Sequence, residues 1–301
     1  MDDRKLYFAG ALWATIFGLS FLVTKGALEA FSPFELLFLR FALATAALGA
    51  LAALRLVKLD YRGKSLLPLV RICLFQPILY FACETYGLKE TASSTAGLIL
   101  GALPAAVAAL SVPMLGERLS PRQALGLVAS VSGVLLIVLG GQSGKAEGAD
   151  SLRGILLIVG ALASAAFYNV YSRRASASYG PVETTFAMMA SGAAFFGALA
   201  LIESLAGTKA GILARATPAA WAAVAYLGIL SSVVAFFLVN LSLSRLKATQ
   251  ASIFGTLTTA VALVAGIAFR GEGLRVPEAI GAAAIIGGVW ATNSRKHALN
   301  I

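Results

Sequence analysis

The sequence predicts an all-α integral membrane protein with ten transmembrane helices arranged as two inverted five-helix repeats. Three observations carry this prediction: the composition, a series of apolar segments of bilayer length, and one stretch that the chain repeats. Apolar residues make up 59% of the 301 residues and charged residues only 13%, against roughly 25% in soluble domains. With a mean hydropathy of +0.85, the chain cannot be a soluble globule.

The repeated stretch runs from Gly116 to Val134 and recurs 155 residues later, from Gly271 to Val289. Both copies open with Gly-Glu-x-Leu and continue with small residues at the same spacing. A repeat of this length, with several apolar segments in each copy, is typical of transporters. Because each copy holds five helices, an odd number, the second copy is inverted. We expect a first repeat over residues 1–140, a polar linker at 141–153 and a second repeat over residues 154–301.

Ten segments fit the roughly 20 residues that cross a bilayer. In chain order they are Leu6–Thr24, Pro33–Leu54, Leu66–Leu88, Thr91–Gly116, Gln123–Gly144, Gly154–Ser172, Thr184–Ile202, Ala216–Ser244, Ala248–Phe269 and Ala279–Ser294. The first is followed at once by another and has no small-residue cleavage site, so we expect it to remain as a helix. Arg40 lies about 10 Å inside the second segment by helical rise. At that depth it needs a partner or a water-filled cleft, unless its side chain snorkels to the surface.

The net charge of +10 is explained by membrane insertion rather than by nucleic-acid binding. Most Lys and Arg residues fall in connections on the same side as the N-terminus, and the loop Arg55–Lys64 is the most basic of them. Basic loops stay in the cytoplasm. Both termini are therefore expected to be cytoplasmic, and the linker is expected to face outward.

Two lines of side chains at i, i+4 and i+8 mark the candidate binding site. They are Gln76, Tyr80 and Glu84 in the third segment, and Ser232, Phe236 and Asn240 in the eighth, its counterpart in the repeat. Residues at this spacing share one helix face, and a seam between inverted repeats meets at the bilayer centre. Gln76 and Tyr80 are expected to contact the solute, with Phe236 and Asn240 closing the far side. Glu84 lies nearer the outer face and is expected to be a gate or proton site.

Other segments add candidates that would line the same cavity: Trp13 and Ser20 in the first, Tyr168 and Asn169 in the sixth, and Thr256 in the ninth. Pro77 removes a backbone donor in mid-membrane, which predicts a break in the third helix. The alternative is that all these polar groups only join one helix to another by hydrogen bonds.

The residues resemble the ten-helix EamA-type exporters of the drug/metabolite transporter superfamily. In the first repeat the resemblance rests on Trp13, Pro33, Arg40-Phe41, Tyr86-Gly87-Leu88, Pro104, Gly116-Glu117-Arg118-Leu119, Gly126 and Gly133. In the second it rests on Arg173-Arg174, Gly271-Glu272-Gly273-Leu274, Gly281 and Gly288. Thr259 stands in place of a family proline, and Phe167-Tyr168 stands where a tryptophan is common. Within the family, the chain most resembles aromatic amino-acid exporters of the bacterial inner membrane.

The resemblance implies a multi-pass secondary transporter of the bacterial inner membrane that exports small metabolites, including aromatic amino acids, by alternating access. Nucleotide-sugar or drug carriers of the same superfamily, and a channel, remain as alternatives. An enzyme is not expected, because the only histidine is His297 in the tail and the carboxylates Glu35 and Glu84 lie on different segments. We expect no catalytic residues, no metal and no cofactor. The partners are a small solute and the bilayer, and the sequence leaves the oligomeric state open, with a monomer as one alternative.

Overall fold

The computed structural model describes residues 3–116, 120–140, 151–206, 217–246, 248–252, 254–271, 273 and 276–293, and helices are the only regular elements in these ranges. Seven helices are long and apolar enough to cross a membrane, and three shorter apolar helices cover Ala124–Ile137, Phe254–Arg270 and Val276–Trp290. The chain is therefore an all-α membrane protein, as the composition predicted. The count of ten crossings stays a prediction. Linker residues 141–150 lie outside the described ranges.

Several expected segments are built from more than one helical piece. The elements are α1 (Asp3–Ala27), α2 (Pro33–Ala53), α3 (Leu67–Cys73), η1 (Leu74–Leu79), α4 (Tyr80–Lys89), α5 (Ser93–Leu100), α6 (Leu103–Leu115), α7 (Pro121–Gly140), α8 (Leu152–Ala175), α9 (Pro181–Leu205), α11 (Pro218–Ala225), η2 (Tyr226–Ala235), α12 (Phe236–Arg245), α13 (Ala248–Ser252), α14 (Phe254–Arg270) and α15 (Val276–Asn293).

The third and eighth segments both contain a π-helical stretch, η1 and η2. In η1 the backbone of Gln76 leaves the helical region, with φ −148° and ψ 115°, directly before Pro77. The break predicted from the proline is confirmed. Moving η1 by the repeat offset of 155 residues gives 229–234, which lies inside η2. The two halves of the chain therefore interrupt corresponding segments at corresponding positions of the sequence repeat.

The starts of α2 and α9 also follow one pattern, x-Pro-x-Glu. Glu35 accepts a hydrogen bond from the Ser32 backbone N–H at 2.7 Å, and Glu183 accepts one from the Gly180 N–H at 2.7 Å. Proline fits the first helical turn, and the glutamate satisfies a backbone donor that would otherwise be unpaired. These local interactions fix where each helix begins.

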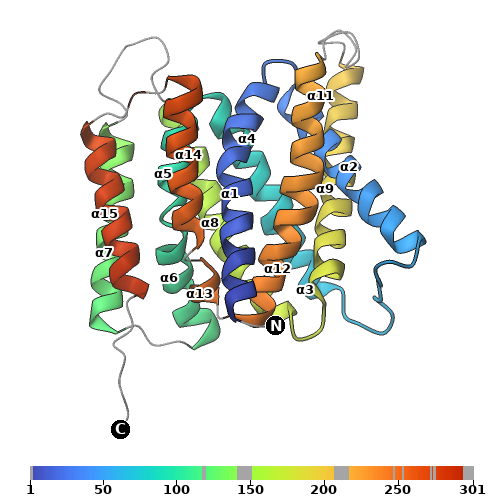
Figure 1. Ribbon diagram of the computed structural model, residues 1–301, viewed down its shortest axis with the longest axis horizontal. Helices are drawn as coiled ribbons and strands as arrows, with labels where there is room; N and C mark the ends of the chain where they lie inside the picture. Colours follow the sequence, from blue (N-terminus) through green and yellow to red (C-terminus); the bar gives the residue numbers. More distant parts are fainter. Residues whose placement is uncertain are drawn as a thin grey trace.

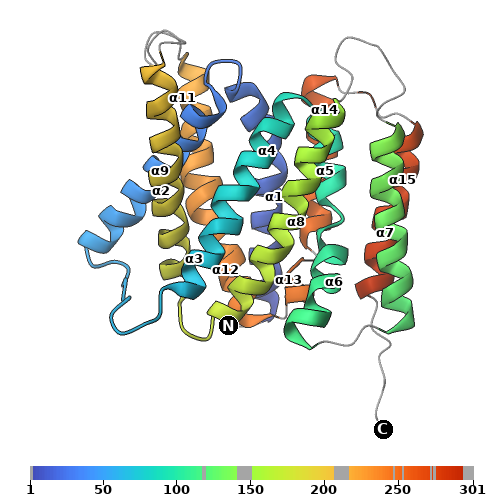
Figure 2. The same cartoon turned by 180° about the vertical axis from the view of Figure 1, so that it is seen from behind.

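Figures 1 and 2 show an upright bundle, with α7 and α15 at one edge, α2 and α9 at the other, and α1, α4, α8, α12 and α14 between them. The first residues of α1 and the last residues of α15 lie at the same end of the bundle, which we call the terminal end. The opposite end is called the distal end. Since α4 runs towards the distal end, Glu84 lies nearer that end than Gln76 does.

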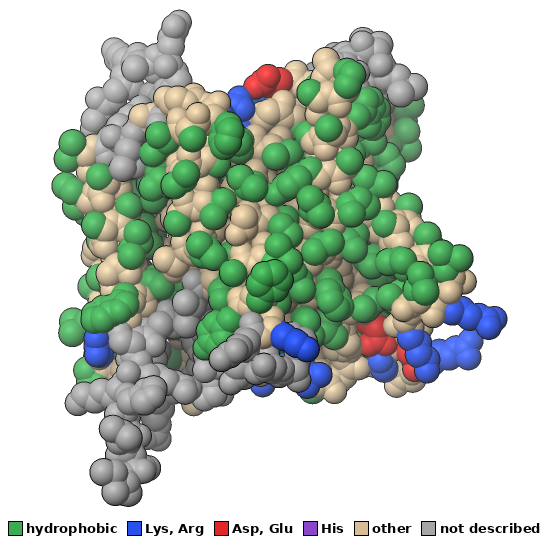
Figure 3. All heavy atoms as spheres, viewed as in Figure 1, with side chains coloured by type: hydrophobic (Ala, Val, Ile, Leu, Met, Phe, Trp, Pro, Cys, Tyr) green, Lys and Arg blue, Asp and Glu red, His purple; other side chains and the backbone are tan. Residues whose placement is uncertain are grey.

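The basic segment 54–66 crosses the terminal end and is held against the start of α9. Lys64 Nζ lies 2.9 Å from Glu183 Oε1, and the Asp60 N–H donates to the same oxygen at 3.0 Å. Burial raises the pKa of the Tyr61 hydroxyl, which therefore stays protonated and donates to the Glu183 carbonyl at 2.7 Å. Figure 3 shows Lys and Arg side chains gathered at this corner, beneath a hydrophobic belt.

Candidate central cavity

A cavity lies in the middle of the bundle, enclosed by α1, η1, α4, α8, η2, α12, α13 and α14, together with the join of α5 and α6. It is lined by Trp13, Phe17, Ser20, Phe21, Gln76, Tyr80, Phe81, Glu84, Leu100, Leu103, Ala165, Tyr168, Asn169, Ser231, Phe236, Val239, Ala251, Ser252, Gly255, Thr258 and Thr259. The space between these side chains is about 780 Å³, including the part open to the surroundings.

Eight of the ten residues that the sequence marked as site candidates line this cavity. They are Trp13, Ser20, Gln76, Tyr80, Glu84, Tyr168, Asn169 and Phe236. Asn240 and Thr256 are not among the lining residues. The structure therefore brings together candidates from both halves of the chain, while two of them point elsewhere.

Asn240 is buried behind Tyr168, where it joins α12 to α8 and α9. Its Oδ1 accepts hydrogen bonds from the Tyr168 hydroxyl at 3.0 Å and from Ser172 Oγ at 2.8 Å, and its Nδ2 donates to Thr185 Oγ1 at 3.0 Å. Because its amide is already occupied by these neighbours, Asn240 positions Tyr168. It does not close the far side of the cavity.

Several polar atoms at the cavity have no protein partner among the described residues. Trp13 Nε1 and Glu84 Oε2 are fully buried and accept or donate no hydrogen bond there. Gln76 and Tyr80 also form none with their side chains within the described structure. Asn169 donates to the Ala165 carbonyl at 2.8 Å, which leaves its Oδ1 available. Buried polar groups without a partner are costly, so these atoms are suited to a polar ligand.

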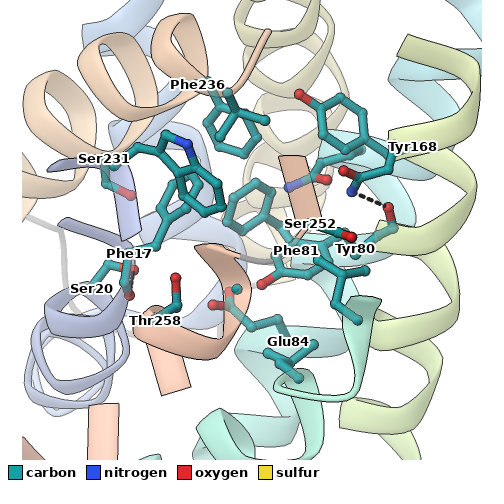
Figure 4. Close-up of a pocket in the computed structure, with 18 of the residues that line it drawn as sticks. Phe17, Ser20, Tyr80, Phe81, Glu84, Tyr168, Ser231, Phe236, Ser252 and Thr258 are labelled. Carbon is teal, nitrogen blue, oxygen red and sulfur yellow. Dashed lines mark hydrogen bonds between the residues drawn. The ribbon is translucent and has the colours of Figure 1, made fainter. Parts of the chain in front are cut away.

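Aromatic rings form a continuous wall in the cavity. The rings of Phe17 and Phe236 are 5.0 Å apart, those of Phe81 and Phe236 are 5.9 Å apart, and those of Tyr80 and Phe81 are 4.9 Å apart. Trp13 and Tyr168 extend the wall at 5.8 Å from Phe17 and 6.2 Å from Phe236. Figure 4 shows rings from α1, α4, α8 and α12 facing one space. Such a wall can stack on a planar or apolar solute.

Arg40 is buried, with 1% of its surface exposed, and it does not snorkel. Its Nη2 donates to Ser231 Oγ at 2.9 Å and its Nε donates to Ser232 Oγ at 3.1 Å. The guanidinium lies 4.4 Å from the centre of the Phe81 ring, a cation–π contact. Within the described structure it forms no ion pair. Arg40 thus fixes two cavity residues, Ser231 and Phe81, without lining the cavity itself.

Sequence reasoning missed four lining residues that the structure makes prominent. Phe17 shares a helix face with Trp13, and Phe81 lies three residues before Glu84, so helical spacing could have found both. Ser231 is displaced from the expected face by η2. No feature of the sequence separates Thr258 from the other threonines of its segment.

The lining of the cavity carries few ionisable groups. No group of three His, Cys, Asp or Glu residues within the described ranges could hold a metal ion. Glu84 is the one carboxylate among the described lining residues, and no Lys, Arg or His joins it there. A single acid among rings, hydroxyls and amides can recognise a small amphipathic molecule.

Residues 4–139 and 152–294 match the EamA-like transporter family. A Bacillus subtilis (strain 168) protein described as "Uncharacterized transporter YcxC" is 35% identical over 294 residues, which are 97% of this chain and 94% of its own. An uncharacterized transporter of Archaeoglobus fulgidus is 24% identical over 95% of this chain and 98% of its own. A crystal structure with 22% identity has a TM-score of 0.67, covering 96% of this chain and 94% of that chain, and supports the fold. The chain belongs to the EamA-like transporter family and is therefore a membrane transporter.

Proposed function

We propose that the protein is a secondary transporter that exports small metabolites, amino acids including aromatic ones, across the bacterial inner membrane by alternating access. The observation that carries the proposal is the central cavity, in which both halves of the chain present aromatic rings together with polar atoms that have no protein partner. An amino acid with an aromatic side chain offers a ring for the wall and charged groups for those atoms.

The basic segment 54–66 at the terminal end favours a cytoplasmic position for that end, because basic connections stay on the cytoplasmic side. With both termini cytoplasmic, Glu84 lies on the outward side of the cavity. Export then carries the solute from the terminal end to the distal end.

A nucleotide-sugar carrier is less well supported, since phosphate groups need cationic partners and the described lining holds no Lys or Arg. A drug carrier of the same superfamily would use the same wall of rings. Efflux from proteoliposomes loaded with a panel of labelled amino acids tests the proposal. We expect faster efflux of phenylalanine and tyrosine than of aspartate. The proposal is overturned if, for every amino acid, efflux from the proteoliposomes is no faster than efflux from protein-free liposomes.

A further inference from the structure

The cavity has two chemically different ends. Figure 4 shows Ser20, Thr258 and Glu84 together on one side, and Phe236 and Tyr168 on the other. Ser20 comes seven residues after Trp13 on α1, and Glu84 comes eight residues after Gln76, so each lies roughly 10 Å further towards the distal end. We call the side with Ser20, Thr258 and Glu84 the carboxylate end of the cavity.

The three residues that define the carboxylate end, Ser20, Thr258 and Glu84, present acceptors to the cavity. Glu84 is only 2% exposed, and its Oε2 has no hydrogen-bond partner among the described residues. Ser20 Oγ donates to the Phe17 carbonyl at 2.7 Å, and Thr258 Oγ1 donates to the Phe254 carbonyl at 3.4 Å. A hydroxyl whose hydrogen is already donated to the backbone keeps its lone pairs as acceptors. This end is therefore matched to a group that only donates.

A primary ammonium group is such a donor, with one positive charge, three N–H bonds and no acceptor. A carboxylate of the substrate would not fit at this end. It would be repelled by Glu84, and the hydroxyl hydrogens of Ser20 and Thr258 are already donated to backbone carbonyls. Arg40 interacts with Glu84 electrostatically, but no ion pair joins the two side chains. The Arg40 guanidinium donates to Ser231 and Ser232 and lies against Phe81. Arg40 does not line the cavity, whereas the Phe81 ring that it contacts does.

We propose that the cavity takes primary amines, with the ammonium group at Glu84 and the apolar part along the aromatic wall. The amine is thus the recognised group of an amino-acid substrate. Glu84 is a direct ligand rather than a gate. This inference rests on the proposed function, since it assigns the solute of the same cavity.

Three probes carry the same phenyl ring and differ in charge. Phenethylamine is a cation, N-acetylphenethylamine is neutral, and 3-phenylpropanoate is an anion. Binding of tritiated phenethylamine to the purified full chain is measured by scintillation proximity, and the other two compete with it. We expect unlabelled phenethylamine to compete at concentrations at least roughly ten-fold lower than either analogue. This comparison uses the wild-type protein and needs no variant to fold.

Two variants and one control localise the effect. Glu84→Gln removes the charge and should weaken phenethylamine binding by roughly ten- to a hundred-fold. Ser20→Ala removes one acceptor and should weaken it by several-fold. Glu29→Gln makes the same chemical change at a distal-end residue that is 72% exposed and pairs with Arg270. That control should bind like the wild type.

Equal competition by the neutral and cationic probes would overturn the inference, as would wild-type affinity in Glu84→Gln, which would return Glu84 to the role of gate or proton site. If phenethylamine does not bind but phenylalanine is transported, the inference falls and the proposed function stands. If neither molecule binds or moves, the proposed function falls as well.

Discussion

At the scale of single residues, the polar groups in this bundle divide into those engaged with the protein and those left for a solute. Asn240 belongs to the first kind, since its amide is hydrogen-bonded to Tyr168, Ser172 and Thr185 on neighbouring helices. Tyr80 and Gln76 belong to the second, because their side chains line the cavity without a described partner. The same residue types in the same kind of membrane helix therefore have different roles, and their hydrogen bonds distinguish them.

Tyr80→Ala removes an aromatic ring from the cavity wall and one hydroxyl group from the polar groups that line the cavity. We expect substrate affinity to fall by roughly ten- to a hundred-fold, or about 1.4–2.7 kcal/mol, as for a central binding residue. Binding of labelled phenylalanine to monodisperse protein measures the change. Tyr7→Ala is the control, since the Tyr7 side chain is 67% exposed on the outer surface of α1. Unchanged affinity in Tyr80→Ala would place the site elsewhere.

Asn240→Ala is expected to act on the fold. It leaves the hydroxyls of Tyr168, Ser172 and Thr185 without their buried partner, and each such loss costs about 1–3 kcal/mol. The thermal unfolding temperature of the purified protein should fall, while the affinity of the remaining folded protein changes by less than that of Tyr80→Ala. A stable Asn240→Ala protein with lost affinity would contradict this role.

At the scale of helices, the π-helical stretches explain why sequence reasoning placed some residues correctly and others not. A π-helical turn repeats at i+5 instead of i+4. Within η2 the residue that shares the cavity face with Phe236 is thus Ser231, five positions earlier, while Ser232 does not line the cavity. The spacing rule worked for Tyr80 and Glu84 because α4 is regular. The π-helical geometry of η2 could not be predicted from the sequence, since no proline lies in this stretch.

The pair α7 and α15 shows what the repeated small residues do. A Cβ added at Gly288 would lie 2.7 Å from the Ser130 backbone nitrogen and against the Gly126 carbonyl, whereas one added at Gly287 would meet nothing within 4 Å. The stripe of small residues thus lets the backbones of α7 and α15 approach closely. Both sequence copies keep glycine because each copy faces the other.

Gly288→Ala should therefore destabilise the protein by about 1–3 kcal/mol, since a methyl group must displace backbone atoms. The adjacent Gly287→Ala is the matched control and should be neutral or slightly stabilising, because alanine favours the helix over glycine. Thermal unfolding of both variants in the same detergent compares them. Equal unfolding temperatures would show that α7 and α15 do not pack as described.

At the scale of the whole molecule, composition and the repeat were enough to predict an all-α membrane protein and the general position of its cavity. Eight of ten candidate residues reached the cavity because mid-membrane polar side chains rarely face lipid. The roles of the other residues depend on contacts between segments that are distant in the sequence. No pattern in the sequence around Asn240 predicts its hydrogen bonds with Tyr168 and Thr185. In the same way, no pattern around Arg40 predicts its hydrogen bond with Ser231.

The orientation in the membrane is predicted from the basic terminal end. In a protein with Cys73 and Cys83 replaced by alanine, Ser65→Cys at the terminal end should react with an impermeant maleimide only after the cytoplasm is opened. Lys89→Cys, an exposed residue where α4 ends at the distal end, should react in intact cells. The reverse pattern would invert the topology and the direction of transport.

Counterflow tests most directly the claim that the central cavity carries a solute by alternating access. Proteoliposomes are loaded with excess unlabelled phenylalanine and diluted into a trace of labelled phenylalanine. A carrier exchanges one molecule for another, so we expect label to accumulate transiently inside above its outside concentration, and far less so with Tyr80→Ala. Label that only equilibrates, at the same rate with and without internal phenylalanine, would show a channel or a leak and rule out alternating access.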